Sequence, residues 1–216
     1  MKKLLLICTS IVLSAMSFGT TIDFSVDSIK LAKPNLTSGK TIMESLSERR
    51  SSREFASTPL TLEEVSEVLW AANGINRDDG KRTSPSAMGV HSLEIYVVFE
   101  GGIYKYDPLE ETITLITKGD HRNLAGLQDF VYSAPLNLIY ITDISKYDRF
   151  SNLTREAKIS LASQDAATSA QNVSLYAAGK ELKGIIRMGA RGDELITVLN
   201  LDSDRYKFVL AQTVGK

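Results

Sequence analysis

A long helical segment between Thr154 and Leu182 limits the folds open to this chain more than any other part of the sequence. Small residues recur along it at helical spacing and form one face, made of Ala162, Ala166, Ala170, Val173 and Ala177. Such a face lets a neighbouring element approach the helix closely. The pattern predicts a central helix or a helix at a dimer interface, and ordinary core packing would satisfy it equally well.

Shorter elements surround this segment. Apolar and β-branched runs predict strands at 93–99, 103–107, 112–117, 136–142, 184–186 and 206–213, with the first two joined by a glycine turn. Helices are predicted at 42–49, near 120–130 and at 193–199, and a further helix begins after the capping box Thr61-Leu62-Glu63-Glu64. The order is not a regular strand–helix alternation, so the fold class is α+β.

The N-terminus has the three parts of a secretory signal peptide. Lys2 and Lys3 precede an apolar run over 4–13, and small residues follow up to Gly19. The run is short for a membrane span, although an uncleaved anchor is the other interpretation. We therefore predict a signal peptide at 1–19, an N-terminal arm or linker at 20–41 and one domain at 42–216. The protein would be exported to the bacterial periplasm or secreted, with no stable membrane insertion after cleavage.

Composition excludes several classes of function. The formal charge is -1, so no overall basic field would attract nucleic acid. Cleavage would remove Cys8, the only cysteine. His91 and His121 are the only histidines of the chain, too few for a zinc cluster. No G-x-S-x-G, P-loop or dinucleotide fingerprint is present. The sequence therefore provides no catalytic and no metal-ligating residue, and leaves chemistry carried by a bound cofactor.

The stretch ERRSSREF, residues 48–55, suggests where such a cofactor would bind. Three arginines lie within five positions, with serines between them. A charge run of this kind is often a solvated surface. Short hydroxyls interleaved with planar, permanently charged guanidinium groups also suit a phosphate.

Four blocks in order make the chain resemble the nitroreductase-like FMN flavoproteins over about residues 42–216. The first is the run from Arg49 to Phe55, and the second is SPSAMG, residues 84–89, leading into LEIYVV. The third is the long helix from Asp165 through Gly184, followed by Met188-Gly189-Ala190. The fourth is the closing run LAQTVGK, residues 210–216.

The resemblance implies a role for each block. Arg49, Arg50 and Ser51 would hold the phosphate and ribityl chain of FMN, and Arg53 would lie near the pyrimidine end of the flavin. Backbone N–H groups of Met188, Gly189 and Ala190 would face the flavin ring near N5. Two further groups would assist: Lys216 at the phosphate, and the loop Pro85-Ser86-Ala87, which would reach the FMN of the opposite subunit.

The resemblance also implies a fold and an activity. The fold would be a mostly antiparallel central sheet flanked by helices, in a homodimer. The activity would be hydride transfer through flavin N5 from NAD(P)H to a small acceptor such as a nitroaromatic compound or a quinone. The P-S-A loop and the L-E-I-Y-V strand are closer to the branch that oxidises azolines to azoles in modified peptides. That dehydrogenase activity, or flavin binding without turnover, are the alternatives.

Overall fold

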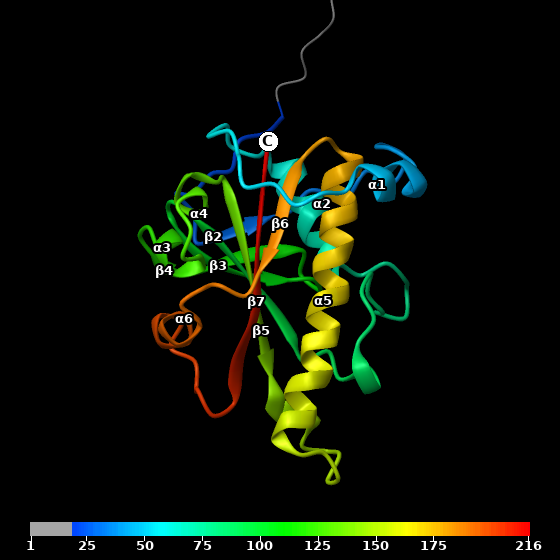
Figure 1. The fold of residues 1–216 in the computed structure, drawn as a ribbon, viewed down its shortest axis with the longest axis vertical. Helices are drawn as coiled ribbons and strands as arrows, with labels where there is room; N and C mark the ends of the chain where they lie inside the picture. Colours follow the sequence, from blue (N-terminus) through cyan, green and yellow to red (C-terminus); the bar gives the residue numbers. More distant parts are fainter. Residues whose placement is uncertain (1–18) are drawn as a thin grey trace, which may run out of the picture.

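The computed structural model describes residues 19–216, so the predicted signal peptide lies outside the described residues except for Gly19. A seven-stranded sheet forms the centre (Figure 1), with the strand order β1-β4-β3-β2-β5-β7-β6. All neighbouring strands in it are antiparallel. The strands are β1 Ser28–Lys30, β2 Leu93–Phe99, β3 Gly102–Asp107, β4 Thr112–Lys118, β5 Leu136–Asp143, β6 Lys183–Arg187 and β7 Tyr206–Gly215. The predicted α+β class and antiparallel sheet are confirmed.

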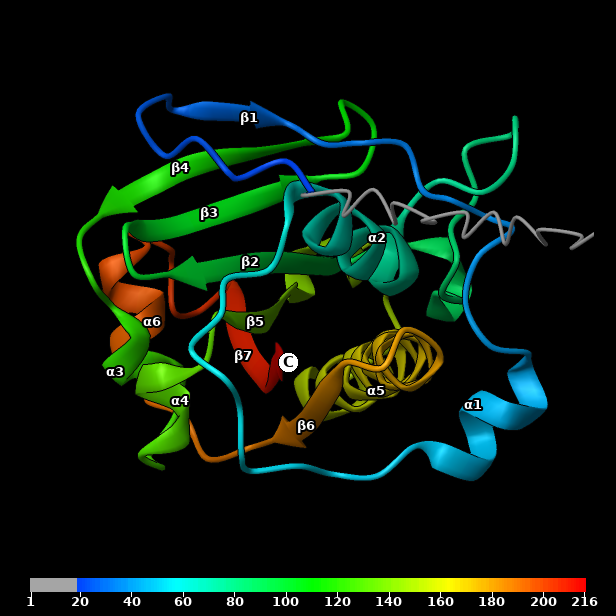
Figure 2. The ribbon, with the colours of Figure 1, turned by 90° about the horizontal axis from the view of Figure 1, so that it is seen from above.

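Helices cover both faces of the sheet. Figure 2 shows α2 and α5 on one side and α3, α4 and α6 on the other. Two apolar clusters match this division, one beneath α2 and α5 and one beneath α3, α4 and α6. The helices are α1 Ile42–Glu48, α2 Leu62–Asn73, α3 Arg122–Ala125, α4 Phe130–Ser133, α5 Arg155–Gly179 and α6 Gly192–Val198. The single helix expected near 120–130 is two short ones separated by Gly126.

Helix α5 is the central helix that its small residues predicted. All five residues of the small face are buried, and four of them belong to the cluster beneath α2 and α5. Thr154 begins the helix by accepting a hydrogen bond from the Ala157 N–H. Core packing within one chain therefore accounts for the small face of α5.

The capping box at Thr61 is also confirmed. The Thr61 hydroxyl accepts from the Glu64 N–H at 3.2 Å, and the Glu64 carboxylate accepts from the Thr61 N–H at 2.8 Å. Two of the donors left unpaired at the start of α2 are thereby satisfied. This fixes where α2 begins, and Val65, Val68 and Leu69 consequently face the core.

Helix α1 is exposed on the side where its apolar residues lie. Ile42 is 60% exposed, Met43 70% and Leu46 49%, whereas Ser45 is buried against the rest of the chain. Helix α1 instead packs on α5 through the small side chain of Ser45, which lies close to Gly179. Its apolar side is left facing outward.

The N-terminal arm is part of the folded body. Ser28–Lys30 forms the edge strand β1 against β4, and the Ala32 and Asn35 N–H groups donate to Ser66 and Glu67 of α2. No local pattern predicted this strand, because its three residues alternate only weakly and pair with a strand more than 80 positions away.

Glu67 anchors the arm to the helices. It is almost fully buried, and it accepts from the Asn35 N–H at 2.8 Å and from the Tyr176 hydroxyl at 2.7 Å. The Lys180 ammonium lies 2.7 Å from the same carboxylate. Burial raises the pKa of Glu67, but the Lys180 ammonium and the two hydrogen bonds lower it by more, so this pKa lies below its usual value.

We expect Glu67→Gln to lower the free energy of unfolding by about 1–2 kcal/mol at pH 7, since it removes the charge that Lys180 and the N–H of Asn35 bind. A lowered carboxyl pKa stabilises the fold above the unfolded value, about pH 4.3, and that stabilisation is lost as pH falls through the folded value. Urea unfolding at pH 7 and pH 3 measures this. Glu110→Gln, at an exposed carboxylate, is the control. An equal difference in the free energy of unfolding between variant and parent at both pH values would contradict this prediction.

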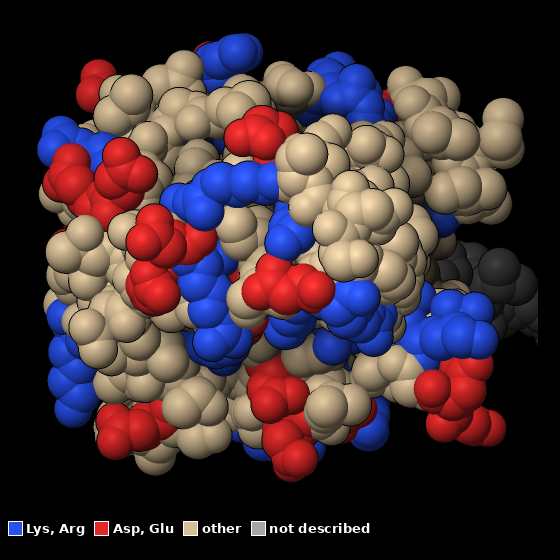
Figure 3. Space-filling model, turned by 90° about the horizontal axis from the view of Figure 1, so that it is seen from below, with Lys and Arg blue, Asp and Glu red and all other residues tan. Residues whose placement is uncertain are grey.

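Charges of both signs cover the surface. On the face seen from below (Figure 3), Lys and Arg side chains alternate with Asp and Glu, and no continuous basic area crosses that face. Within residues 19–216, no helix is long and apolar enough to span a membrane.

Candidate functional site

The segment from Arg49 to Ala56 is fixed against the open edge of β6. The Arg49 N–H donates to the Ser45 carbonyl at 2.9 Å and so ends α1. Ser51 then forms a parallel bridge with Gly184, and the Ser52 N–H donates to the Gly184 carbonyl at 3.1 Å. Further on, the Ala56 N–H donates to the Lys216 carbonyl at 2.8 Å. The predicted binding stretch is therefore held by backbone pairing (Figure 2).

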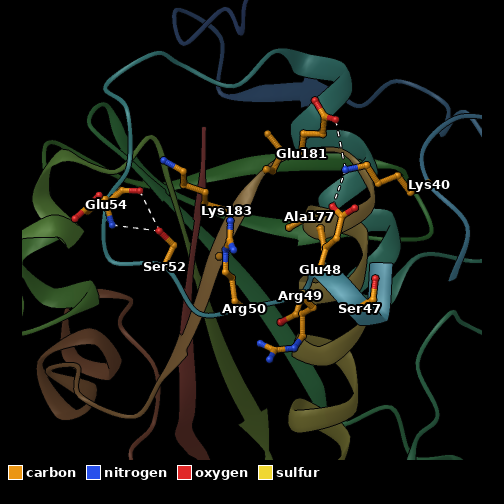
Figure 4. A pocket seen from close by; sticks show the side chains of 14 residues that line it. Lys40, Ser47, Glu48, Arg49, Arg50, Ser52, Glu54, Ala177, Glu181 and Lys183 are labelled. Atoms are coloured by element: carbon orange, nitrogen blue, oxygen red, sulfur yellow. Dashed lines mark hydrogen bonds and ion pairs between the residues drawn. The ribbon is translucent and has the colours of Figure 1, made fainter. Parts of the chain in front are cut away.

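A cavity of about 710 Å³ opens where this segment meets the ends of α1 and α5 and the start of β6. Ala177 and Ala178 form part of its apolar wall. Figure 4 shows the cationic side chains that line it. They are Lys40, Arg49, Arg50 and Lys183.

These four cations differ in their partners. The Lys40 ammonium lies 2.6 Å from Glu48 and 3.4 Å from Glu181, and the Glu48 carboxylate holds the pKa of Lys40 above its usual value. Arg49, Arg50 and Lys183 form no ion pair with any residue of the described chain. Unpaired cations on the wall of a cavity that also has small side chains are suited to binding an anion such as a phosphate.

The serines of the segment are used differently. The Ser52 hydroxyl lies in a local turn, accepting from the Glu54 N–H at 3.3 Å and donating to the Glu54 carbonyl at 3.2 Å. The side chains of Ser51 and Arg53 are exposed, and neither belongs to the cavity wall. Phe55 packs on Phe130 with ring centroids 5.7 Å apart. Of the four predicted residues in this stretch, the structure brings Arg49 and Arg50 to the cavity and leaves Ser51 and Arg53 beside it.

The loop Pro85-Ser86-Ala87 lies elsewhere on the subunit. Asp165 of α5 fixes it, because the Ser86 hydroxyl donates to Asp165 Oδ2 at 3.0 Å and the Ala87 N–H to Oδ1 at 2.9 Å. Asp165 and Ala177 are 177 - 165 = 12 positions apart, or about 18 Å along a helix. One subunit therefore does not bring this loop to the cavity at the end of α5.

Met188, Gly189 and Ala190 follow the last residue of β6. Met188 is 78% exposed, and the space where a Cβ of Gly189 would lie is open. The Ala190 N–H donates to the Met188 carbonyl at 2.9 Å, so that amide is already engaged. Lys183 and Met188 are 188 - 183 = 5 positions apart, about 16 Å at the usual rise of a strand. Ile186, 39% exposed between them, continues a surface from the cavity to this turn.

Arg187 lies beneath that surface. It is 7% exposed, and its guanidinium donates to the Ala125 carbonyl at 2.7 Å, to Asn137 at 3.1 Å and to Thr213 at 2.6 Å. Burial takes the charge out of water and lowers the pKa of Arg187 to about 10. Its contacts tie β6 to β5, β7 and the end of α3, and so hold the strand that carries the Met188 turn.

Lys216 does not reach the cavity. Its ammonium lies 3.2 Å from Glu64 at the start of α2, and Lys216 is absent from the cavity wall. In the described part of the chain, Glu64 is therefore the ion-pair partner of the ammonium that the resemblance assigns to the phosphate. No group of three or more His, Cys, Asp or Glu side chains in residues 19–216 could hold a metal ion.

Two cations of the cavity, Lys40 and Lys183, are not among the residues predicted from the sequence. Lys40 precedes α1, and Lys183 begins β6, which comes after α5 in the sequence and 183 - 50 = 133 positions after Arg50. Only the pairing of Ser51 and Ser52 with Gly184 brings Lys183 to them. No local pattern in the sequence carries that information.

Comparisons with known proteins agree on one family. A sequence model described as the Nitroreductase family matches residues 46–216. A Methanocaldococcus jannaschii protein named as a nitroreductase is 34% identical over 180 residues, which cover 79% of this chain and 88% of that protein.

Solved structures extend the likeness to the fold. A Ralstonia eutropha protein, also named as a nitroreductase, is 34% identical with a TM-score of 0.81, covering 92% of this chain and 93% of its own. An NADPH:FMN oxidoreductase from Vibrio harveyi, solved with NAD+, is 17% identical with a TM-score of 0.58 over 81% of this chain and 67% of its own. At that identity, the second likeness concerns the fold alone.

Proposed function

The chain belongs to the nitroreductase family, which makes it a flavin-dependent oxidoreductase, and we propose that it carries electrons from NAD(P)H to a small acceptor. The acceptor would be a compound such as a nitroaromatic or a quinone. The observation that carries the proposal is the cavity at the family motif, where Arg49 and Arg50 line the wall without an ion-pair partner in the described chain.

The residues present fit FMN. Its phosphate is a dianion that needs fixed cations, and Arg49 and Arg50 provide them beside the small side chains of α5. The exposed surface over Ile186 leads from this point to Met188 and Gly189, where a flat ring would find an open glycine and backbone donors. We assign the ribityl chain to Ser51 and the pyrimidine end of the ring to Arg53.

Bound FMN would supply reversible uptake and release of two electrons, which none of the side chains here provides. The protein would contribute orientation and charge. Arg53, exposed beside the cavity, would stabilise negative charge appearing on the ring, and the Met188 and Gly189 amides would orient the ring edge. Protons would come from water, so we assign no catalytic acid or base.

We also propose that the active form is a homodimer. The exposed apolar residues Ile42, Met43 and Leu46 of α1 form a surface that a second copy would cover. The separation of about 18 Å along α5 between the Pro85–Ala87 loop and the cavity also supports it. In a dimer, Pro85, Ser86 and Ala87 would serve the site of the partner subunit.

Export of the protein remains a proposal, based on the signal-peptide pattern of residues 1–19. Sec export moves unfolded chains, and FMN would then be captured in the periplasm or outside the cell. Mass spectrometry of the protein from fractionated cells tests this. A mature N-terminus near residue 20 in the periplasm or medium would support export, and an intact Met1 in the cytoplasm would contradict it.

The test of function is an absorbance spectrum of the purified protein before and after desalting. We expect flavin bands that stay with the protein, bleach when NADH or NADPH is added without oxygen, and return on addition of a nitroaromatic compound. A protein that retains no flavin even after saturation with FMN would contradict the proposal. Retained flavin that neither pyridine nucleotide bleaches would indicate flavin binding without turnover.

A second candidate is a dehydrogenase of a peptide-derived heterocycle, azoline to azole. The P-S-A loop and the strand Leu93–Phe99 support it, since both resemble that branch. Such an enzyme would take electrons from its substrate and give them to oxygen. Bleaching by an azoline peptide, with NADH and NADPH inactive, would favour this candidate over the first.

A further inference from the structure

The charges of the cavity divide into a paired and an unpaired set. Lys40 is held by Glu48 and Glu181, and the formal sum of these three side chains is 1 - 2 = -1. The remaining charged side chains of the wall are Arg49, Arg50, Lys183 and Glu54. None of them forms an ion pair within the described chain, and their formal sum is 3 - 1 = +2. A phosphate monoester carries about -1.5 to -2 at pH 7, so it is opposite in sign to the unpaired set and to the whole wall, which sums to 2 - 1 = +1.

Lys183 is placed in this set by the sheet. It is the first residue of β6, opposite Gly215 of β7, and its neighbour Gly184 accepts the Ser52 N–H at 3.1 Å. Backbone pairing on both sides of the strand therefore fixes the base of the Lys183 side chain next to the arginine segment. A charge carried by a strand is held more firmly than one on a free loop.

Lys183 lines the same cavity as Arg50. Figure 4 shows the two entering the cavity from different elements, Arg50 from the segment after α1 and Lys183 from β6. Arg49, at the end of α1, leaves the backbone in a different direction from Arg50. An anion beside Arg50 and Lys183 would thus meet cations from two elements.

We propose that Lys183 is the third phosphate-binding cation of the site, and that it makes the site selective for a flavin with a terminal phosphate over riboflavin. The inference rests on the proposed function, because it concerns the same cavity. It assigns Lys183 to the phosphate end only, since Lys183 begins β6, five positions before the turn at Met188.

The test is titration of the full chain, dialysed free of flavin, with FMN and separately with riboflavin, followed by flavin fluorescence. Lys183→Met should weaken FMN binding about tenfold, the effect of losing one exposed charge-assisted contact, and leave riboflavin binding unchanged. Lys183→Arg should restore most of the FMN affinity. Raising the salt concentration should weaken FMN binding less in Lys183→Met than in the parent.

Lys118→Met is the matched control, since Lys118 is also an exposed strand lysine but lies on β4. It should bind both flavins as the parent does. Equal weakening of FMN and riboflavin in Lys183→Met would overturn the phosphate assignment, and so would unchanged FMN binding, while the proposed function would stand in both cases. A parent protein that binds neither flavin would overturn the proposed function together with this inference.

Discussion

Arg187→Ala should lower the free energy of unfolding by about 3 kcal/mol. The variant loses three hydrogen bonds from a guanidinium that is 7% exposed, and it leaves a cavity where that group stood. Three buried acceptors then lose their Arg187 donor: the Ala125 carbonyl, Asn137 Oδ1 and Thr213 Oγ1. Opposing the loss is relief from burying a charge, which Arg187 bears without a carboxylate partner in the described chain. Three bonds to a charged donor outweigh that relief.

Urea unfolding of three variants separates the loss of the hydrogen bonds from the relief of the buried charge. Arg191→Ala, four residues later on the surface, should change stability by no more than about 0.5 kcal/mol. Arg187→Met fills the volume without donating hydrogen bonds, and we expect it to lie between the parent and Arg187→Ala. Full stability in Arg187→Ala would show that the buried charge opposes folding as strongly as its hydrogen bonds support it.

Arg49→Ala should weaken FMN binding by about 1.5–3 kcal/mol, which is roughly 10- to 150-fold in the dissociation constant. The backbone of Arg49 is fixed at the end of α1, and its side chain lines the cavity without an ion pair in residues 19–216. A guanidinium donates two parallel hydrogen bonds to one phosphate, so its loss should exceed that of a lysine. Fluorescence titration with FMN at fixed salt measures the change.

The control for Arg49 is Arg77→Ala, at an exposed arginine in the loop after α2. Its FMN affinity should equal that of the parent. Riboflavin provides a second check, because an arginine that binds only the phosphate should not affect it. If Arg49→Ala binds FMN as tightly as the parent, the assignment of Arg49 to the phosphate is wrong.

Elements with strong local signals were predictable from sequence. The Thr61–Glu64 capping box, the glycine turn between β2 and β3, and the unbroken apolar run of β5 each depend on neighbouring residues. The strand β1 was not predictable, since Ile29 gains its place only by pairing with Ile113. The spacing of Ile42 and Leu46 likewise locates an apolar face on α1 and does not say what covers it.

The same distinction between local and long-range signals applies to the residues of the candidate site. The motif located Arg49 and Arg50, which the structure places on one cavity wall. It could not locate Lys183, which joins them through a bridge between Ser51 and Gly184. Lys216 is the last residue of the closing motif, and its ammonium pairs with Glu64. The same Glu64 carboxylate accepts the Thr61 N–H in the capping box of α2.

The bridge between Ser51 and Gly184 has a consequence for solubility. β6 is the last strand of the sheet, and an uncovered edge strand is a template on which another chain can add. Ser51 and Ser52 occupy part of that edge, with the Ser52 N–H on the Gly184 carbonyl. The stretch that carries the phosphate-binding arginines thereby also shields the molecule from edge-to-edge aggregation. A proline at residue 52, which removes that N–H, would expose the edge even if every cationic side chain stayed in place.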